Sequence, residues 1–344
     1  MAVTSTYQKN SEATQPEVCA VVLNYNGKTL NERCLRSLLS QTYPALRILF
    51  VDNGSSDGSF QDVKHIFSDS IEYLDNGENL FFAAGNNRGI RQALDTGAEY
   101  VFIINNDTEL SVDCVERLVE CMQKNPEAGG CQPVMFDMSP DDPVGGWNRA
   151  DRSIASAGIQ ISLSGRCWDN KSYEFHGKDR FIPVSGVTGG AMFLSAQAID
   201  ACGMFDESYV MYFEDVDLSL RLQGQSYTLY LASRARVGHL VSATTKRYAS
   251  LLRIKYCEAN ALKLIQRHFP TKYKVQAYLL STVFTFGSSL KWALRGRMPI
   301  GIAALSGFFS GFRSNLRSLL FDRSFKNKKN MAEHILSHIW YPPA

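Results

Sequence analysis

The chain has 344 residues, 45% of them apolar, so it is long enough to bury one large core or two smaller ones. Its eight cysteines form no Cys-x-x-Cys pair, which excludes the common zinc modules and is typical of buried thiols in a reducing cytosol. The formal net charge is only +2, but residues 244–330 carry 17 Lys and Arg against two acids. An acidic body therefore precedes a basic, aromatic-rich C-terminal third, which favours an anionic lipid surface over nucleic acid as its partner.

The first half of the chain alternates apolar runs with amphipathic segments. We predict a flexible arm over residues 1–16, and then four strands at 18–24, 46–52, 71–75 and 99–104. Helices are expected at 28–41, near 57–68 and at 86–97, the last opened by a Gly/Asn-rich loop at 79–89. This alternation predicts a doubly wound, Rossmann-like, mostly parallel sheet, in which ligands bind at the carboxyl ends of the strands.

The second half is less regular. A helix is expected at 111–124, loops and short strands over 136–182, a strand in GVTGGAMFL, a helix near 196–202 and a late strand at 227–231. From residue 250 onward the pattern becomes helical. We therefore divide the α/β domain, residues 17–245, into halves at 17–110 and 111–245, followed by a basic helical region at 246–344.

Polar residues follow two of the predicted strands. In VDNGSSDGS, Asp52 has the chemistry to accept a hydrogen bond from the imide of uracil or thymine, and Asn53 offers both a donor and an acceptor. In INNDTEL, Asp107 is a hard oxygen ligand suited to Mg²⁺ or Mn²⁺, with a substrate diphosphate completing the site. Ordinary strand-to-helix turns with capping side chains remain the alternative for both segments.

Three acids crowd the segment YFEDVDLSLRLQ, where Glu214, Asp215 and Asp217 begin a predicted helix. A carboxylate there suits a general base that deprotonates a hydroxyl, although the helix dipole alone also favours acids at this position. His239 follows the late strand and is either a metal or diphosphate ligand or a structural residue.

Taken in order, these motifs resemble family 2 glycosyltransferases of the GT-A fold. The order runs from VVLNYNG through VDNGSSDG, NLFFAAGNNRG, INNDT, a GG-containing strand and FDESYVMYFEDVDLSLRL to a late GH, and covers residues 18–260. The branch that it most resembles is the bacterial rhamnosyltransferase-like one, whose members build O-antigen, capsule or cell-wall polysaccharides. The resemblance implies a nucleotide-binding half at 17–110 and an acceptor half at 111–245.

The resemblance also implies roles for individual residues. The catalytic base matches Asp215, and the metal ligands match Asp107 and His239. Asn stands where the family has a second acid, at Asn53 and Asn105, so the metal rests mainly on Asp107. Glu214, Trp147 and Arg247 are assigned to the acceptor side. The residues expected to line the donor are Leu23, Tyr25, Asp52, Asn53, Asn79, Asn87, Asn105, Asn106, Gly189 and Gly190.

The function implied by the resemblance is inverting, Mg²⁺- or Mn²⁺-dependent transfer of a sugar from a nucleotide diphosphate to a hydroxyl of a glycan or lipid-linked acceptor. Rhamnose from dTDP-rhamnose is the leading donor by subgroup, and UDP-hexose or galactofuranose is the alternative. An alternative hypothesis is a binding or scaffold protein that has the glycosyltransferase fold but no catalytic activity. The Asn residues at positions 53 and 105 favour this alternative.

The C-terminal region contains two apolar stretches, at 277–294 and in PIGIAALSGFFSGF, with basic residues between and after them. Eighteen residues that include a Gly and a Lys are marginal for crossing a bilayer. We therefore predict interfacial helices, a protein peripheral to the cytoplasmic face of the membrane, and no nucleic-acid binding. Packing of these helices on the core or in a homodimer is the alternative.

Overall fold

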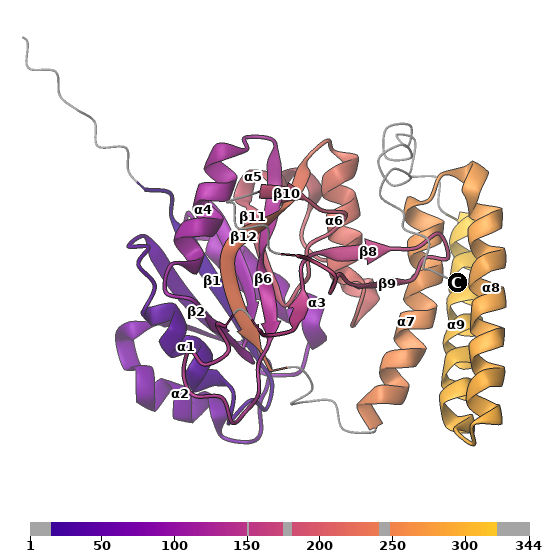
Figure 1. Cartoon of the computed structure of the whole chain (residues 1–344), viewed down its shortest axis with the longest axis horizontal. Helices are drawn as coiled ribbons and strands as arrows, with labels where there is room; N and C mark the ends of the chain where they lie inside the picture. Colours follow the sequence, from indigo (N-terminus) through magenta and orange to yellow (C-terminus); the bar gives the residue numbers. More distant parts are fainter. Residues whose placement is uncertain (1–14, 150, 175–180, 241–247, 322–344) are drawn as a thin grey trace, which may run out of the picture.

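The computed structural model describes residues 15–149, 151–174, 181–240 and 248–321. An α/β domain occupies one side of the molecule, and helices α7, α8 and α9 stand as a separate layer on the other (Figure 1). The strands are β1 (Val18–Asn24), β2 (Leu46–Asp52), β3 (Glu72–Asp75), β4 (Tyr100–Asn105), β5 (Thr108–Leu110), β6 (Ala128–Asp137), β7 (Ile154–Ser156), β8 (Ile159–Ile161), β9 (Cys167–Asp169), β10 (Phe181–Pro183), β11 (Ala191–Ser195) and β12 (Thr228–His239). The helices are α1 (Asn31–Leu39), α2 (Ser59–Phe67), α3 (Phe81–Asp95), α4 (Cys114–Lys124), α5 (Ala196–Cys202), α6 (Glu214–Gly224), α7 (Tyr248–His268), α8 (Thr271–Leu294) and α9 (Met298–Phe321), with short 3-10 turns η1 (Ser68–Ser70) and η2 (Glu207–Tyr209).

One mixed sheet runs through the α/β domain in the order β10-β12-β6-β11-β4-β1-β2-β3. Strands β4, β1, β2 and β3 are mutually parallel, and so are β6 and β12. Strand β11 runs antiparallel to its neighbours β4 and β6. The predicted doubly wound, mostly parallel sheet with a helical C-terminal region is thereby confirmed, and the carboxyl ends of β1, β2 and β4 lie together at one edge.

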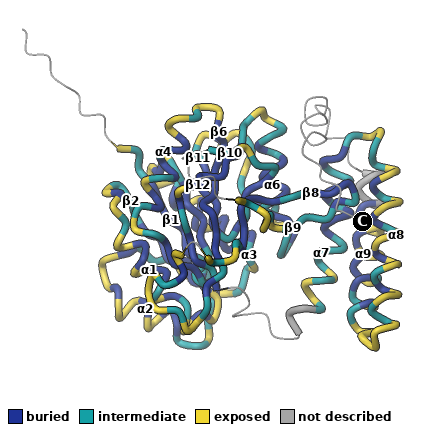
Figure 2. Tube along the Cα trace, in the orientation of Figure 1, coloured by how far each residue is buried: buried dark blue, intermediate teal, exposed yellow. Residues whose placement is uncertain are grey.

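Strand β1 illustrates how the apolar runs build two cores. Val18, Ala20 and Val22 belong to one buried cluster with α1, α2 and α4, whereas Cys19 and Val21 belong to another with α3, α5 and α6. Successive side chains of a strand point to opposite faces, so an unbroken apolar run needs helices on both sides. Figure 2 shows this buried centre between two exposed helical layers.

Some predicted elements differ in length. Helix α3 begins at Phe81 rather than at residue 86, and the Asn79 side chain, just before the helix, accepts a hydrogen bond from the Phe81 N–H, at 2.9 Å. Strand β12 continues to His239 instead of ending at 231, since it pairs with β6 across an irregularity between Ala232 and Arg236.

Strand β6 was not predicted, because Gly129, Gly130 and Pro133 are typical of turns. The neighbouring chain explains the glycine at position 130, where an added Cβ would lie 2.8 Å from the carbonyl oxygen of Phe193 on β11. Tertiary packing of β6 between β11 and β12 therefore overrides its local sequence.

A hairpin formed by β8 and β9 joins the two parts of the molecule (Figure 1). At its tip Arg166 donates to both carboxylate oxygens of Glu258 on α7, at 2.5 and 2.6 Å, and to the Thr285 hydroxyl on α8. Residues of the hairpin, α6 and α7 share one buried apolar cluster. Within the described residues, none of the helices is apolar over a length that would span a bilayer. The flexible arm predicted over residues 1–16 falls mostly on residues 1–14, which lie outside the described residues. The domain boundary predicted at residue 245 falls within 241–247, which also lies outside them.

Candidate functional site

The carboxyl ends of β1 and β2 are joined by a buried hydrogen-bond network. Asn24 donates to Asp52, at 2.8 Å, and to the hydroxyl of Ser59, at 2.9 Å. The second carboxylate oxygen of Asp52 accepts the Ser55 N–H, at 2.9 Å. Asp52 is buried, and both of its carboxylate oxygens accept hydrogen bonds, so its role in this structure is to stabilise the turn after β2.

Asn53 and Asn79, two predicted donor residues, are brought into contact. The Asn53 amide donates to Asn79 Oδ1, at 3.0 Å, and its oxygen accepts the Leu80 N–H, at 3.2 Å. The two asparagines brace the entry to α3. Beside them Leu23 is half-buried and Tyr25 is 48% exposed, so the Tyr25 ring is the part of this edge that is open to a planar ligand.

The segment after β4 lies against β1 and β11. Asn105 N–H donates to the Gly190 carbonyl, at 3.0 Å, so these two predicted donor residues are neighbours. Asn106 donates to Asn24, at 3.2 Å, and to Asn31, at 2.7 Å. Both asparagines therefore fix the turn that presents the next residue, Asp107.

Asp107 and His239 meet although they lie far apart in the sequence. The pairing of β5 with β12 sets His239 opposite Thr108, and Asp107 Oδ1 lies 3.3 Å from His239 Nε2. Burial lowers the pKa of His239, but the charges of Asp107, Asp169 and Asp137 outweigh that effect and raise the pKa above its usual value. The resemblance assigned these two residues to one metal, and their contact fits that assignment.

Asp107 and His239 have the chemistry of ligands for a divalent metal. Asp107 Oδ1 is buried and lies 3.3 Å from His239 Nε2 without a well-formed hydrogen bond, so both atoms are placed to bind one cation. Asp107 and His239 together offer a carboxylate oxygen and an imidazole nitrogen, both ordinary metal ligands. No group of three or more His, Cys, Asp or Glu side chains is arranged for a metal within the part of the chain that the structure describes. The residues fit a metal whose remaining ligands are water and substrate oxygens.

Asp215 is held at the start of α6 by two backbone N–H groups. Gly189 donates to its Oδ2, at 2.9 Å, and Val216 donates to its Oδ1, at 2.8 Å. Burial and the charge of Asp169 raise the pKa of Asp215, while these backbone bonds lower it in part. The Gly189 contact ties the carboxylate to the segment that leads to Gly190 and Asn105, so Asp215 and the turn before Asp107 belong to one site.

The three acids of α6 have different environments. Glu214 is buried, and burial together with the charge of Asp215 raises its pKa, which favours its protonated form. Asp217 is also buried, but it accepts hydrogen bonds from Arg221, at 2.8 Å, and Tyr209, at 3.1 Å, and it contacts His268. Burial opposes ionisation of Asp217, but His268 and the arginines hold its pKa well below the usual range. Asp215 is thus the acid left to exchange a proton with a ligand.

Two predicted site residues are buried away from this surface, and a third lies outside the described residues. Asn87 is buried and exchanges hydrogen bonds with the Phe205 backbone, at 2.9 and 3.0 Å, so it tethers α3 to the segment before α6. Trp147 is 1% exposed and stacks beneath Gly238 and Phe136, which leaves none of its ring for an acceptor. The prediction for Trp147 is corrected to a core role. Arg247 lies outside the described residues.

Two acids near the site were not singled out from the sequence. Asp137 ends β6 and pairs in register with His239, and Asp169 lies on β9. The charge of Asp169 acts on both His239 and Asp215. An acid after the apolar run VMF was the available signal for Asp137, whereas nothing local marks Asp169.

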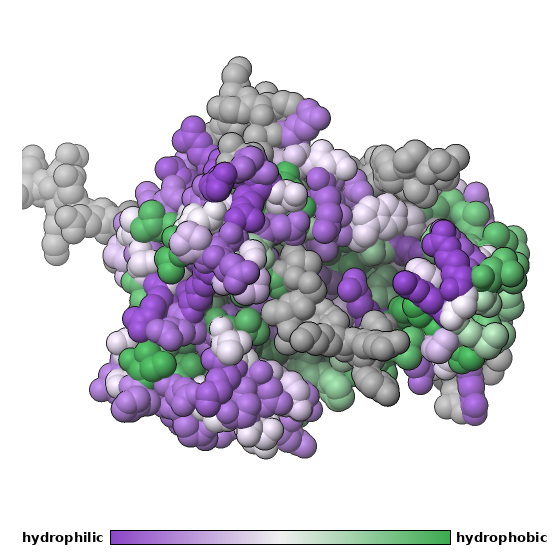
Figure 3. Space-filling model, turned by 60° about the horizontal axis from the view of Figure 1, so that its bottom comes forward, coloured by the Kyte–Doolittle hydropathy of each residue, from purple (hydrophilic) through white to green (hydrophobic). Residues whose placement is uncertain are grey.

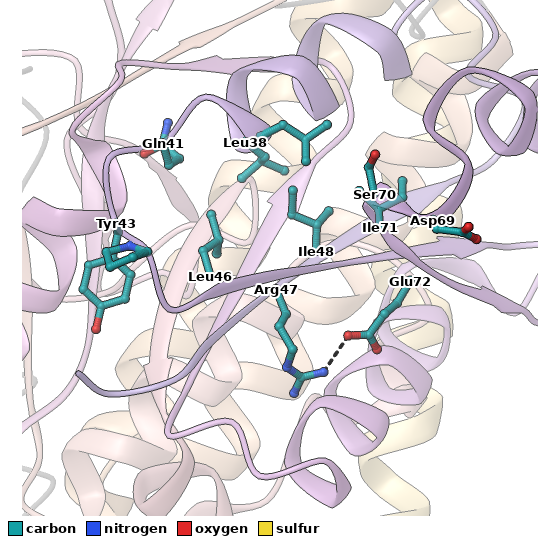
Figure 4. Close-up of a pocket in the computed structure, with 12 residues that line it drawn as sticks. Leu38, Gln41, Tyr43, Leu46, Arg47, Ile48, Asp69, Ser70, Ile71 and Glu72 are labelled. Carbon is teal, nitrogen blue, oxygen red and sulfur yellow. Dashed lines mark hydrogen bonds and ion pairs between the residues drawn. The ribbon is translucent and has the colours of Figure 1, made fainter. Parts of the chain in front are cut away.

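A surface pocket of about 400 Å³ lies away from this site (Figure 4). Leu46 and Ile48 at the start of β2 line it, together with Ile71 and Glu72 at the start of β3. Its polar wall is an ion pair in which Arg47 donates to Glu72, at 2.7 Å. The pocket is therefore at the amino ends of the parallel strands, opposite to the end where Asp107 and Asp215 lie.

The model of one protein family, glycosyl transferase family 2, matches residues 19–200. An N-acetylglucosaminyl-diphospho-decaprenol L-rhamnosyltransferase from Mycobacterium tuberculosis is 26% identical over 294 residues, which is 81% of this chain and 90% of that protein. A dTDP-rhamnosyl transferase from Shigella flexneri is 21% identical and spans 78% of this chain and 86% of its own.

Solved structures share the fold. TarS residues 1–349 from S. aureus superimposes with a TM-score of 0.56 at 14% identity, covering 88% of this chain and 83% of that one. GalNAc-T7, solved with UDP, GalNAc and Mn²⁺, gives a TM-score of 0.55 at 12% identity over 73% of this chain. This chain spans about half the length of GalNAc-T7, at 51%.

Proposed function

Because this chain belongs to glycosyl transferase family 2, we propose that it is an inverting, metal-dependent enzyme that moves rhamnose from dTDP-rhamnose to a hydroxyl of a lipid-linked or growing glycan. The observation that carries the proposal is Asp215, an acid with a raised pKa, which two backbone N–H groups hold beside the glycine segment of the site. Such a carboxylate has the geometry of a general base rather than of a structural ion pair.

In the proposed reaction Asp215 takes the proton of the acceptor hydroxyl as that oxygen attacks the anomeric carbon of the donor. The new glycosidic bond forms while the bond to the nucleoside diphosphate breaks, and the anomeric configuration inverts. The Gly189 N–H keeps the Asp215 carboxylate oriented, and the protonated form of Glu214 avoids a second charge beside it. A divalent metal held by Asp107 and His239 would supply positive charge against the departing diphosphate.

The sugar and the acceptor are inferred from the relatives. One is named a rhamnosyltransferase that acts on N-acetylglucosaminyl-diphospho-decaprenol, and another is named a dTDP-rhamnosyl transferase. We accordingly propose a polyprenyl-diphosphate-linked sugar as the acceptor and polysaccharide synthesis as the setting. Tyr25, exposed beside the buried Asp52 and Asn53, is the proposed contact for the thymine base.

The membrane surface is the proposed location of the reaction, and α8 supports it. Ser281, Thr285 and Ser289 face inward and are buried, whereas large apolar side chains face outward. Small residues inside and large apolar residues outside is the pattern of a helix that packs against protein on one side and lipid on the other. The outward set on α8 and α9 is Val275, Leu279, Val283, Phe286, Leu290, Leu294, Met298, Ile302, Phe309 and Phe312.

Basic residues border this apolar face. Lys291, Arg295 and Arg297 are exposed at the turn between α8 and α9, and Arg313 is exposed on α9. Figure 3 displays the apolar side chains gathered over this end of the molecule, with hydrophilic residues beside them. Anionic headgroups satisfy the basic rim and acyl chains cover the apolar face, so an anionic bilayer surface fits better than a second copy of a chain with the same charge.

The test is a donor panel with the full chain and vesicles that contain N-acetylglucosaminyl-diphospho-polyprenol. Release of nucleoside diphosphate is measured for dTDP-rhamnose, UDP-glucose, UDP-galactose and UDP-galactofuranose. We expect the largest kcat/KM with dTDP-rhamnose, and a product of inverted anomeric configuration by NMR. A preference for a UDP-sugar would replace the donor. Nucleotide binding without turnover of any donor would support a binding protein instead.

Metal dependence is tested in the same assay. EDTA is expected to remove activity, and Mg²⁺ or Mn²⁺ to restore it, because a metal held by Asp107 and His239 would supply positive charge against the departing diphosphate. Asp107→Ala should need a higher metal concentration for half-maximal activity. Full activity in EDTA would contradict the metal role of both residues.

A further inference from the structure

The backbone just before Asp215 has an unusual conformation. Val210 has φ 64° and ψ −61°, and the Met211 N–H donates to the Tyr209 carbonyl two residues earlier, at 2.7 Å. This is a γ-turn with positive φ, a conformation that is rare and strained. Positive φ is especially unfavourable for a β-branched residue such as valine. Tyr212 and Phe213 also have positive φ, 65° and 75°. Positive φ at three of the four residues 210–213 persists only where surrounding contacts hold the backbone.

One side chain from the C-terminal region contacts three backbone carbonyls of this segment. Asn260, on α7, is buried, and its Nδ2 lies 3.2 Å from the Tyr209 carbonyl oxygen, 3.0 Å from that of Met211 and 2.8 Å from that of Tyr212. An amide nitrogen has two hydrogens, so three carbonyls converge on one donor group. Without it, three carbonyl oxygens of the strained segment would lose this partner.

Helix α7 is itself fixed from both sides. Toward the α/β domain, His268 contacts Asp217 of α6, at 2.7 Å, and Arg267 pairs with Asp206. Toward α9, a Cβ at Gly311 would lie 2.7 Å from the Ala259 carbonyl oxygen, so the two helix backbones are in close contact next to Asn260. A side chain on α7 is therefore rigidly placed relative to α6.

We propose that Asn260 is a positioning residue, which holds segment 209–213 in the conformation that sets Asp215 at the start of α6. The C-terminal helical region is then part of the catalytic machinery and not only a surface for docking. The inference rests on the proposed function in one respect, that Asp215 is the base. The strained segment and its three-carbonyl clamp are independent of that assignment.

The experiment compares Asn260→Ala and Asn260→Asp with Asn315→Ala in the full chain. Asn315 is a matched control, because it is a buried α9 asparagine that donates to the Leu262 carbonyl, at 2.8 Å, and to the Tyr278 hydroxyl, at 3.1 Å. Asn260→Asp keeps the size of the side chain but replaces the donor with an acceptor that repels the three carbonyls.

Both Asn260 variants are expected to lower kcat about 100-fold, the effect of a small misplacement of a catalytic group, with the KM for the donor within about threefold of wild type. Affinity for dTDP and UDP, measured by calorimetry, should be unchanged. Amide hydrogen exchange over residues 205–216 should become faster in both variants and stay at the wild-type rate in Asn315→Ala.

Two results would overturn the proposal: exchange over 205–216 that matches wild type in both Asn260 variants, or a loss of dTDP and UDP binding in parallel with kcat, which indicates general unfolding. Hydrogen exchange needs no turnover. A wild-type chain that is inactive with every donor would therefore refute the proposed function while exchange still decides the role of Asn260.

Discussion

The α/β domain and the C-terminal helices bury their side chains by opposite rules. In β1 the large apolar residues point into two cores and the polar Asn24 lies at the strand end. In α8 small polar residues such as Ser281 and Thr285 are buried, while Val283 is 71% exposed. The first arrangement buries its apolar residues within the domain, whereas the second leaves an exposed apolar face of the kind that marks an interaction surface. The difference separates the part that holds the candidate site from the part proposed to lie against a membrane.

The largest effect is expected in the α/β domain, from Asp215→Asn. The amide cannot accept the acceptor proton, so kcat should fall by about 10³-fold or more. Affinity for dTDP and UDP should persist, because the fold and the donor edge are unchanged. Asp151→Asn, which alters an exposed acid, is the control. Near-wild-type turnover of Asp215→Asn would assign the base to another group.

The next effect joins the two regions through Asp217. Asp217→Asn leaves Arg221 and Arg267 without their buried carboxylate, and should lower the free energy of unfolding by about 3 kcal/mol. Urea denaturation measures it, with Glu120→Gln in the exposed pair with Lys124 as a control that costs under about 1 kcal/mol. Because its pKa is lowered in the fold, wild-type Asp217 stabilises above its unfolded pKa, and that stabilisation is lost as pH falls through the folded one. If Asp217→Asn lowered the free energy of unfolding no more than Glu120→Gln does, the ion pairs of Asp217 would not hold the C-terminal helices to the α/β domain.

The apolar face of α8 is tested with Val283→Ser plus Leu290→Ser. Burial of each side chain in lipid is worth more than about 1 kcal/mol, so binding to anionic vesicles should weaken at least about tenfold in a flotation assay. Val144→Ser, at a residue 85% exposed in the α/β domain, is the control. High salt should also release the wild type, since the rim is basic. Unchanged vesicle binding, with a dimer lost in light scattering, would make this face a contact between copies.

The smallest effect is in the pH dependence of turnover. Because the pKa of Asp215 is raised, kcat at saturating donor and metal should increase with pH through a midpoint above that of an ordinary aspartate. The midpoint should be absent from the residual activity of Asp215→Asn. A kcat that stays constant down to the usual aspartate range would contradict the buried environment of the base.

Several features of the site could be predicted because they are local. The bounds of β1 and β2 match the predicted ones at 18–24 and 46–52, since unbroken apolar runs ending in polar residues leave little choice. Strand topology then brings their carboxyl ends together. Strand β6 could not be predicted, because its glycines and Pro133 make sense only between β11 and β12. Asp169 was missed for the same reason, since only the β8–β9 hairpin brings it near Asp215.

The sequence by itself determined the sheet, the strand-end residues and the acidic start of α6, because these features depend on the type and spacing of residues that are close together in the sequence. Only the tertiary structure decided the state of each group. It separated Asp215, which two backbone N–H groups hold, from Asp217, which accepts a hydrogen bond from Arg221 and contacts His268. It also buried Trp147 and joined Asn260 to the backbone before Asp215. Charge and burial depend on neighbours that are distant in sequence, and folding alone brings those neighbours together.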